Sequence, residues 1–246
     1  SEELLYQMFG INAELLIDHA WGYESCTIAQ IRAYKPQSSS LGCGQVLHCP
    51  YTADKARIVV QEMIDGISLE LVEKRLVTDQ LVLTVGYDIE NLTRSEIRKV
   101  YKGPVTTDRY GRRVPKHAHG TWNLPRATSS SSELLEAMAA LYDKIVNPAL
   151  LIRRMSLSAC HVVNEKMAKE REQKETFEQL DLFTDYAKKE AKEKEEQKKR
   201  ERERRMQEAL LTIKKKYGKN AVLRGMNFEE GATAKERNGQ IGGHQA

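Results

Sequence analysis

Hydrophobic positions between residues 38 and 163 change their spacing several times, which predicts alternating strands and helices. Residues 76–87 alternate apolar and polar side chains, as a half-buried strand does. Residues 41–49, 116–125 and 151–163 are the other predicted strands. Helical spacing follows Thr52, a good N-cap, and a second helix follows Ser130, three residues before Glu133 as in a capping box.

These elements follow one another in the order β-α-β-β-α-β, which predicts an α+β fold. A unit of this order forms a four-stranded sheet with both helices on one face, so the other face is open to solvent or to a polar ligand. We expect Leu81, Leu83 and Val85 to point into the core on one strand, and Met155, Leu157 and Ala159 on the last strand.

The flanking segments are shorter or more polar, and they set the expected domain boundaries. Residues 1–24 read as two short helices and 25–37 as a linker before the 38–163 domain. A linker (164–186), a charged helix (187–217) and a flexible tail (218–246) follow. The helix is rich in Glu–Lys and Glu–Arg pairs at i,i+4 spacing, with a contact face expected at its end, at Met206, Leu210, Ile213 and Tyr217.

Composition adds limits to this picture. The 246 residues are 40% hydrophobic and 30% charged, with a net charge of +4, and the apolar residues concentrate before residue 163. The four cysteines form no metal-site or secreted-domain pattern, which indicates free thiols in a reducing cytoplasm. The sequence shows no signal peptide and no membrane span, so we expect a cytoplasmic protein without a membrane partner. The chain starts without Met inside a predicted helix, which indicates a fragment.

One short motif stands between two polar stretches: Gln179, Leu180, Asp181, Leu182 and Phe183. It resembles the peptide with which bacterial replication and repair proteins bind the β sliding clamp. A Gln amide can pair with backbone at the edge of a groove, while Leu182 and Phe183 fill an apolar pocket. The alternative interpretation is that these apolar residues cap a neighbouring helix.

The wider chain resembles the C-terminal part of a Y-family translesion DNA polymerase, namely the end of the thumb, the little finger and a clamp-binding tail. It is most similar to the Gram-positive UV-damage-repair branch related to the UmuC/ImpB/MucB/SamB proteins. The resemblance rests on five sequence motifs: His19-Ala20-Trp21-Gly22, Ser40-Leu41-Gly42, Leu151-Ile152-Arg153-Arg154-Met155, residues 108–120 and residues 216–221.

The resemblance implies sequence-independent binding of primer–template DNA in SOS-type repair. The residues it assigns to DNA are Ser39, Ser40, Gly42, Arg109, Arg112, Arg113, Lys116, Arg153 and Arg154. Ser39 and Cys43 stand where the family often has basic residues, so phosphate contacts by the first strand are in question. The family's Mg²⁺-binding carboxylates belong to the palm, which these residues do not include, so we expect no polymerase activity and no cofactor here.

Other interpretations stay open at this point. The basic residues of 109–116 could follow a DNA backbone or merely keep a long insertion in solution. His117, His119, Cys43, His48 and Cys49 lack the spacing of a zinc site. An RNA-binding module of the RRM kind needs stacking aromatic residues on its central strands, and none is present there. A non-catalytic adaptor between the clamp and another protein is the third possibility.

Overall fold

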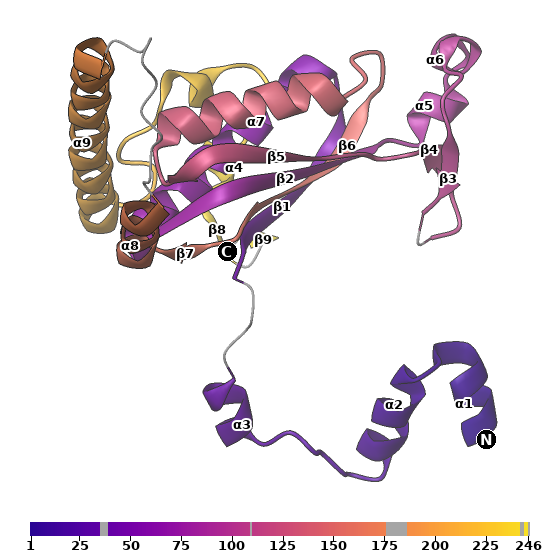
Figure 1. Ribbon diagram of the computed structural model, residues 1–246. Coiled ribbons are helices and arrows are strands. Elements are labelled where there is room, and N and C mark those ends of the chain that lie inside the picture. Colours follow the sequence, from indigo (N-terminus) through magenta and orange to yellow (C-terminus); the bar gives the residue numbers. More distant parts are fainter. Residues whose placement is uncertain (35–38, 109, 176–185, 242–243, 246) are drawn as a thin grey trace. The chain divides into compact units, whose positions relative to one another are not determined.

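The computed structural model describes residues 1–246 except 35–38, 109, 176–185, 242–243 and 246 (Figure 1). It divides into two units, residues 1–37 and 38–246. The first unit contains α1 (Glu2–Phe9), α2 (Asn12–Ala20) and α3 (Ile28–Ala33). Gly10, at φ 58°, ends α1. Among the described residues of this unit only Ala13 is buried, so these helices have almost no core of their own.

The second unit is built on an antiparallel sheet of four long strands. These are β1 (Leu41–Tyr51), β2 (Leu76–Tyr87), β5 (Ala118–Thr128) and β6 (Ile152–Cys160), in the spatial order β1-β6-β2-β5. A two-residue strand, β7 (Val163–Asn164), pairs with the start of β2. Helices α4 (Ala53–Lys74) and α7 (Ser131–Ile145) pack side by side on one face of the sheet (Figure 1). The predicted α+β fold is therefore confirmed.

The core lies between this sheet face and the two helices. Leu81, Leu83 and Val85 of β2 are fully buried there, as predicted from the alternation. Met155, Leu157 and Ala159 of β6 are buried beside them. Each fully buried Leu or Val contributes about 1.5–3 kcal/mol relative to exposure, which is why the period of two fixes which face of the sheet is inside.

Residues 88–115, for which the sequence predicts no helix or strand, are structured. They form α5 (Glu90–Thr93), α6 (Ser95–Val100) and a hairpin of β3 (Val105–Thr107) with β4 (Arg113–Pro115). We call this segment the basic excursion. Buried Asn91 anchors it: its amide donates to the Leu151 carbonyl at 2.8 Å and accepts from the Leu151 N–H at 2.7 Å. Two helices of four and six residues are too short to give a readable period.

After the sheet the chain continues in α8 (Glu165–Glu175) and α9 (Tyr186–Tyr217). The predicted contact face of α9 is wrong at three positions. Met206 and Tyr217 are 52% and 67% exposed and Ile213 is also exposed, whereas Gln207 is only 1% exposed. The helix is held by polar residues: Glu203 accepts hydrogen bonds from Ser130 Oγ and the Ser132 N–H at 2.7 and 2.8 Å.

That contact explains the start of α7. The first N–H groups of a helix need acceptors, and here Glu203 supplies one from another helix. The predicted capping box is half formed, because Ser130 Oγ accepts from the Glu133 N–H at 3.3 Å while the Glu133 carboxylate pairs with Arg126. Gln207 completes the contact by donating to the Ser129 carbonyl and to Ser131 Oγ.

The predicted flexible tail is also wrong for most of its described residues. The segment after α9 contains a 3-10 turn, η1 (Gly225–Phe228), then α10 (Ala234–Arg237) and a small pair, β8 (Gln240–Ile241) with β9 (His244–Gln245). Both η1 and α10 contact α4. They are ordered by polar contacts rather than by an apolar stripe, so hydrophobic spacing could not reveal them. None of the helices in the described part of the chain is both long and apolar enough to cross a bilayer.

Candidate nucleic-acid interface

The face of the sheet that carries no helix is lined by small and polar side chains. Along its middle, Thr84 of β2 lies between His119 of β5 and Ser156 of β6, and Ser156 lies opposite Gly44 of β1. The next row joins Thr121, Val82, Ser158 and Gly42. Thr84 Oγ1 and His119 Nδ1 are 2.9 Å apart and hydrogen-bonded. This open face is polar enough to meet a hydrated ligand.

Arg154 lies across the open face at one end of the sheet. It is paired with Gly86 in the β2–β6 register, and a Cβ on Gly86 would be 2.6 Å from the Arg154 Cγ. The missing side chain at Gly86 therefore leaves the space in which Arg154 lies. Among the described residues no carboxylate pairs with Arg154, and its side chain is exposed.

A shallow hollow of about 400 Å³ surrounds this arginine. Its lining includes Gly44, Thr84, Gly86, His117 and Ser156, all from the open face or its end. Hydroxyl and imidazole groups beside an unpaired guanidinium suit a phosphate group, because each can donate a hydrogen bond to a phosphate oxygen.

Arg153 has a different position from its neighbour. Its NH1 donates to the His48 carbonyl at 3.1 Å, and its Nε is 3.8 Å from Asp88 Oδ2. Neighbouring residues of a strand point to opposite sides, and the structure places only Arg154 on the open face. The charge of Arg153 is partly balanced within the domain.

The first-strand residues lie at the other end of the sheet. The Ser39 carbonyl accepts a hydrogen bond from the Val162 N–H at 3.0 Å. Ser40 is exposed just before β1. A Cβ at Gly42 would come within 2.9 Å of Ser158 Oγ, so this glycine permits the close approach of β1 and β6. The predicted DNA-binding residues are thus divided between two ends of the open face.

The basic excursion lies at the Arg154 end, where β4 contacts β2 and α5. The Arg112 guanidinium pairs with Asp108 at 2.7 Å and holds the pKa of that carboxyl below its usual value. Arg112 also lies over the Tyr110 ring, 5.0 Å from its centroid. Arg113 and Lys116 are exposed, and in the described residues neither has an ion pair, while Arg109 lies outside those residues. Arg112 is therefore less available to a ligand than Arg113 or Lys116.

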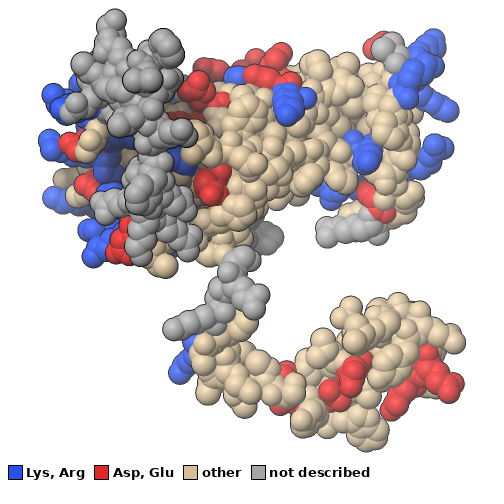
Figure 2. Space-filling model, in the orientation of Figure 1, with Lys and Arg blue, Asp and Glu red and all other residues tan. Residues whose placement is uncertain are grey.

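Positive charge gathers unevenly over the surface. Figure 2 shows Lys and Arg concentrated on the excursion end of the domain and along α9, with few between them. Both segments have a basic surplus: α9 carries 13 Lys and Arg against seven Glu, and residues 88–115 carry seven Lys and Arg against four Asp and Glu. Both regions therefore attract a polyanion, and the excursion end is the one that lies beside Arg154.

The clamp-type residues Gln179, Leu180, Asp181, Leu182 and Phe183 lie outside the described residues. They fall between α8 and α9, and both helices are attached to the domain. The Glu165 N–H donates to the Arg75 carbonyl at 3.1 Å, and Glu165 also pairs with Arg204 of α9 at 3.3 Å. The peptide therefore belongs to a connection whose two flanking helices are fixed to the sheet domain.

Sequence reasoning did not single out most of the residues around Arg154. It treats His117 and His119 only as possible metal ligands, although the strand period of β5 could have placed His119 on the open face. Gly86 gave no signal, since its role appears only when Arg154 is placed beside it. Within the part of the chain that the structure describes, no three His, Cys, Asp or Glu side chains are grouped to hold a metal ion.

Burial affects the chemistry of one cysteine near the sheet. It raises the pKa of the Cys43 thiol to about 11, since the charged thiolate is poorly solvated there. All four cysteines are free. Cys43 therefore belongs to the packing of β1 and not to a reactive site.

Neither the models of known protein families nor the curated protein sequences match this chain.

Proposed function

We propose that this protein is the DNA-binding and clamp-tethering part of a Y-family translesion DNA polymerase, acting in cytoplasmic DNA repair. The observation that carries the DNA part is Arg154, which lies unpaired on a small, polar sheet face beside the basic excursion. Phosphate contacts of this kind fix the position of a protein on DNA without reading its sequence.

The surface chemistry favours duplex backbone over single-stranded RNA. An RRM-type surface stacks bases on aromatic side chains of its central strands. The open-face positions of β2 and β6 carry instead Val82, Thr84, Ser156 and Ser158. Hydroxyl groups and one guanidinium can bind phosphate but offer no stacking surface.

Fluorescence anisotropy with a labelled primer–template duplex tests the DNA proposal. Binding should be independent of sequence and should weaken steeply as salt increases, because phosphate neutralisation releases counterions. Arg154→Ala should lower affinity for all sequences alike and reduce the salt slope by about one. Arg153→Ala should have a smaller effect, because its charge is partly balanced.

The matched control is Arg57→Ala. Arg57 pairs with Asp143 at 3.0 Å between the two helices of the covered face, so this variant loses the same charge far from the open face. Equal loss of affinity in Arg57→Ala and Arg154→Ala would refute the open face as the DNA site. A preference for single-stranded RNA would favour the RRM-type interpretation.

Calorimetry with the β clamp tests the tethering proposal. The double variant Leu182→Ala, Phe183→Ala should lose detectable binding, because each buried apolar anchor contributes about 1.5–3 kcal/mol. Micromolar affinity is expected for the parent protein. The control is Met206→Ala, Tyr217→Ala, which removes exposed apolar surface from α9. Unchanged clamp affinity in the first variant would mean that the peptide only caps a helix.

The proposal assigns no catalysis to these residues. Polymerases of this family seat two Mg²⁺ ions on palm carboxylates, and the residues assigned here bind DNA and the clamp instead. A primer-extension assay with the purified chain should yield no extended product with either Mg²⁺ or Mn²⁺. Any metal-dependent extension would overturn this part of the proposal.

A further inference from the structure

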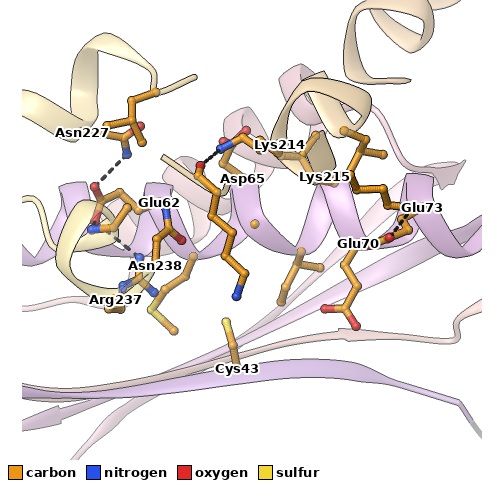
Figure 3. Close-up of a pocket in the computed structure, with 18 of the residues that line it drawn as sticks. Cys43, Glu62, Asp65, Glu70, Glu73, Lys214, Lys215, Asn227, Arg237 and Asn238 are labelled. Atoms are coloured by element: carbon orange, nitrogen blue, oxygen red, sulfur yellow. Dashed lines mark hydrogen bonds and ion pairs between the residues drawn. The ribbon is translucent and has the colours of Figure 1, made fainter. Parts of the chain in front are cut away.

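The segment 220–238, which we call the strap, is fastened to α4 by one buried carboxylate. The Glu62 side chain has no exposed surface. It accepts a hydrogen bond from Asn227 Nδ2 at 2.8 Å (Figure 3). It also accepts from the Thr233 N–H at 2.8 Å and from the Ala234 N–H at 2.9 Å. Arg237 NH2 is 3.5 Å away. The donors of the strap replace the water that a carboxylate otherwise needs, so Glu62 can be buried only beneath the closed strap.

Further contacts hold the strap along its length. Arg224 pairs with Asp65 at 2.7 Å, one helical turn from Glu62 on α4. Gln45 of β1 donates to Thr233 Oγ1 at 3.1 Å. Asn238 donates to Asn220 Oδ1 at 2.8 Å, which joins the two ends of the strap. The strap is therefore attached to both α4 and β1.

The helix before the strap has a weak interface of its own. No apolar side chain in the described part of α9 is fully buried, and Leu210 and Leu211 are only half-buried. Glu203 and Gln207 supply hydrogen bonds, each of which contributes only about 1 kcal/mol net because water competes for the same groups. Such a contact depends on whatever keeps the helix close to the domain.

A hollow of about 640 Å³ lies between α4, the end of α9 and the strap (Figure 3). Across it Lys215 pairs with Glu73 at 2.8 Å, and Lys214 Nζ donates to the Lys219 carbonyl at 2.8 Å. Burial lowers the pKa of Lys214. Met63, Ile67, Leu211 and Leu223 also line the hollow, so opening the strap would expose apolar surface as well as these polar contacts.

We propose that the strap is a closure device that holds α9 against the sheet domain. Closing it on Glu62 fixes the C-terminal end of α9, while Glu203 and Gln207 fix its middle on α7. With two fixed points α9 is a rigid arm, and with the strap open it is a loosely attached helix. The consequence for clamp binding rests on the proposed function: a fixed α9 restricts where the preceding peptide can meet the clamp.

Amide hydrogen exchange of the full chain, measured by mass spectrometry without DNA or clamp, tests whether the strap holds α9. The variant Asn227→Ala, Arg237→Ala removes two side chains that hold Glu62 and leaves α4 unchanged. Exchange in residues 224–238 and in residues 203–214 should both become about tenfold faster, as expected for the loss of a charge-assisted hydrogen bond. Exchange in β2 and β6 should not change.

The matched control is Glu230→Ala, on the same strap. Glu230 pairs with Lys55 at 2.5 Å, but its side chain is 85% exposed, so exchange should stay like that of the parent. Faster exchange in the strap with unchanged exchange in α9 would overturn the proposal, as would no change in either. Glu62→Gln, which places an amide against these donors, should repeat the effect of the strap variant. Neither DNA nor clamp is present, so a negative result leaves the proposed function untouched.

Discussion

Arg154 lies where a side chain on Gly86 would otherwise be, with the Arg154 Cγ 2.6 Å from the position of a Cβ on that glycine. Gly86 lies near the end of β2 and has no positive φ, so it matters for the space it leaves and not for its conformational freedom.

Gly86→Ala should therefore fold and yet bind DNA less well. The added methyl meets a flexible side chain and not backbone, so Arg154 can move away from the sheet. We expect a loss of DNA affinity close to that of Arg154→Ala, measured by anisotropy, with a small change in the free energy of unfolding. DNA binding equal to that of the parent would show that the resting position of Arg154 is unimportant.

Gly66→Ala, in α4, should stabilise the protein by about 0.5–1 kcal/mol. A Cβ at Gly66 would meet nothing within 4 Å, because this residue lines the hollow beneath the strap. Alanine lowers the entropy of the unfolded chain and suits a helix. Urea unfolding followed by circular dichroism gives the measurement. A destabilised variant would mean that the hollow is narrower than described.

Gln207→Ala should destabilise the protein by about 1–3 kcal/mol, because it leaves the buried Ser129 carbonyl and Ser131 Oγ without their donor. Met206→Ala, at the exposed neighbouring position, should stay within about 0.5 kcal/mol. Urea unfolding of both variants distinguishes the two faces of α9. Equal effects would contradict the polar docking of this helix.

Cys43 should resist alkylation at pH 8, while exposed Cys26 and Cys49 react. A thiol whose pKa is raised to about 11 is protonated at pH 8, with about one thiolate per thousand molecules. The alkylation rate of Cys43 should rise as the pH increases toward 11, whereas the alkylation rate of an ordinary thiol levels off at a lower pH. Iodoacetamide labelling and peptide mass spectrometry give the rates. Cys43 reacting as fast as Cys26 would show that β1 is not packed there.

The sheet and its two long helices could be predicted because apolar burial sets their period. Residues 76–87 matched β2 at both ends, and the buried sides of β2 and β6 followed from alternation alone. The basic excursion could not be found in this way, since its helices span barely one or two turns and buried Asn91 holds it in place.

The structure of the segment after the sheet could not be predicted for a related reason. Glu62 reads as a solvent-facing helix residue, and only the structure reveals that Thr233 and Asn227 meet it. Apolar spacing on α9 pointed to Met206 and Tyr217, but hydrogen bonds to Ser129–Ser132 turn Gln207 inward instead. Hydrogen-bonded contacts between distant segments leave no periodic pattern of apolar residues, so they cannot be predicted from a single sequence.

The Val162 N–H donates a hydrogen bond to the Ser39 carbonyl at 3.0 Å, which brings together the points where the chain enters and leaves the sheet. A unit whose two ends meet can be inserted into another chain, or cut and rejoined elsewhere, without rebuilding its interior. Joining these ends by a short linker and opening the chain in the excursion hairpin would give a rearranged protein with the same sheet. Evolution could move such a unit between larger proteins by the same route.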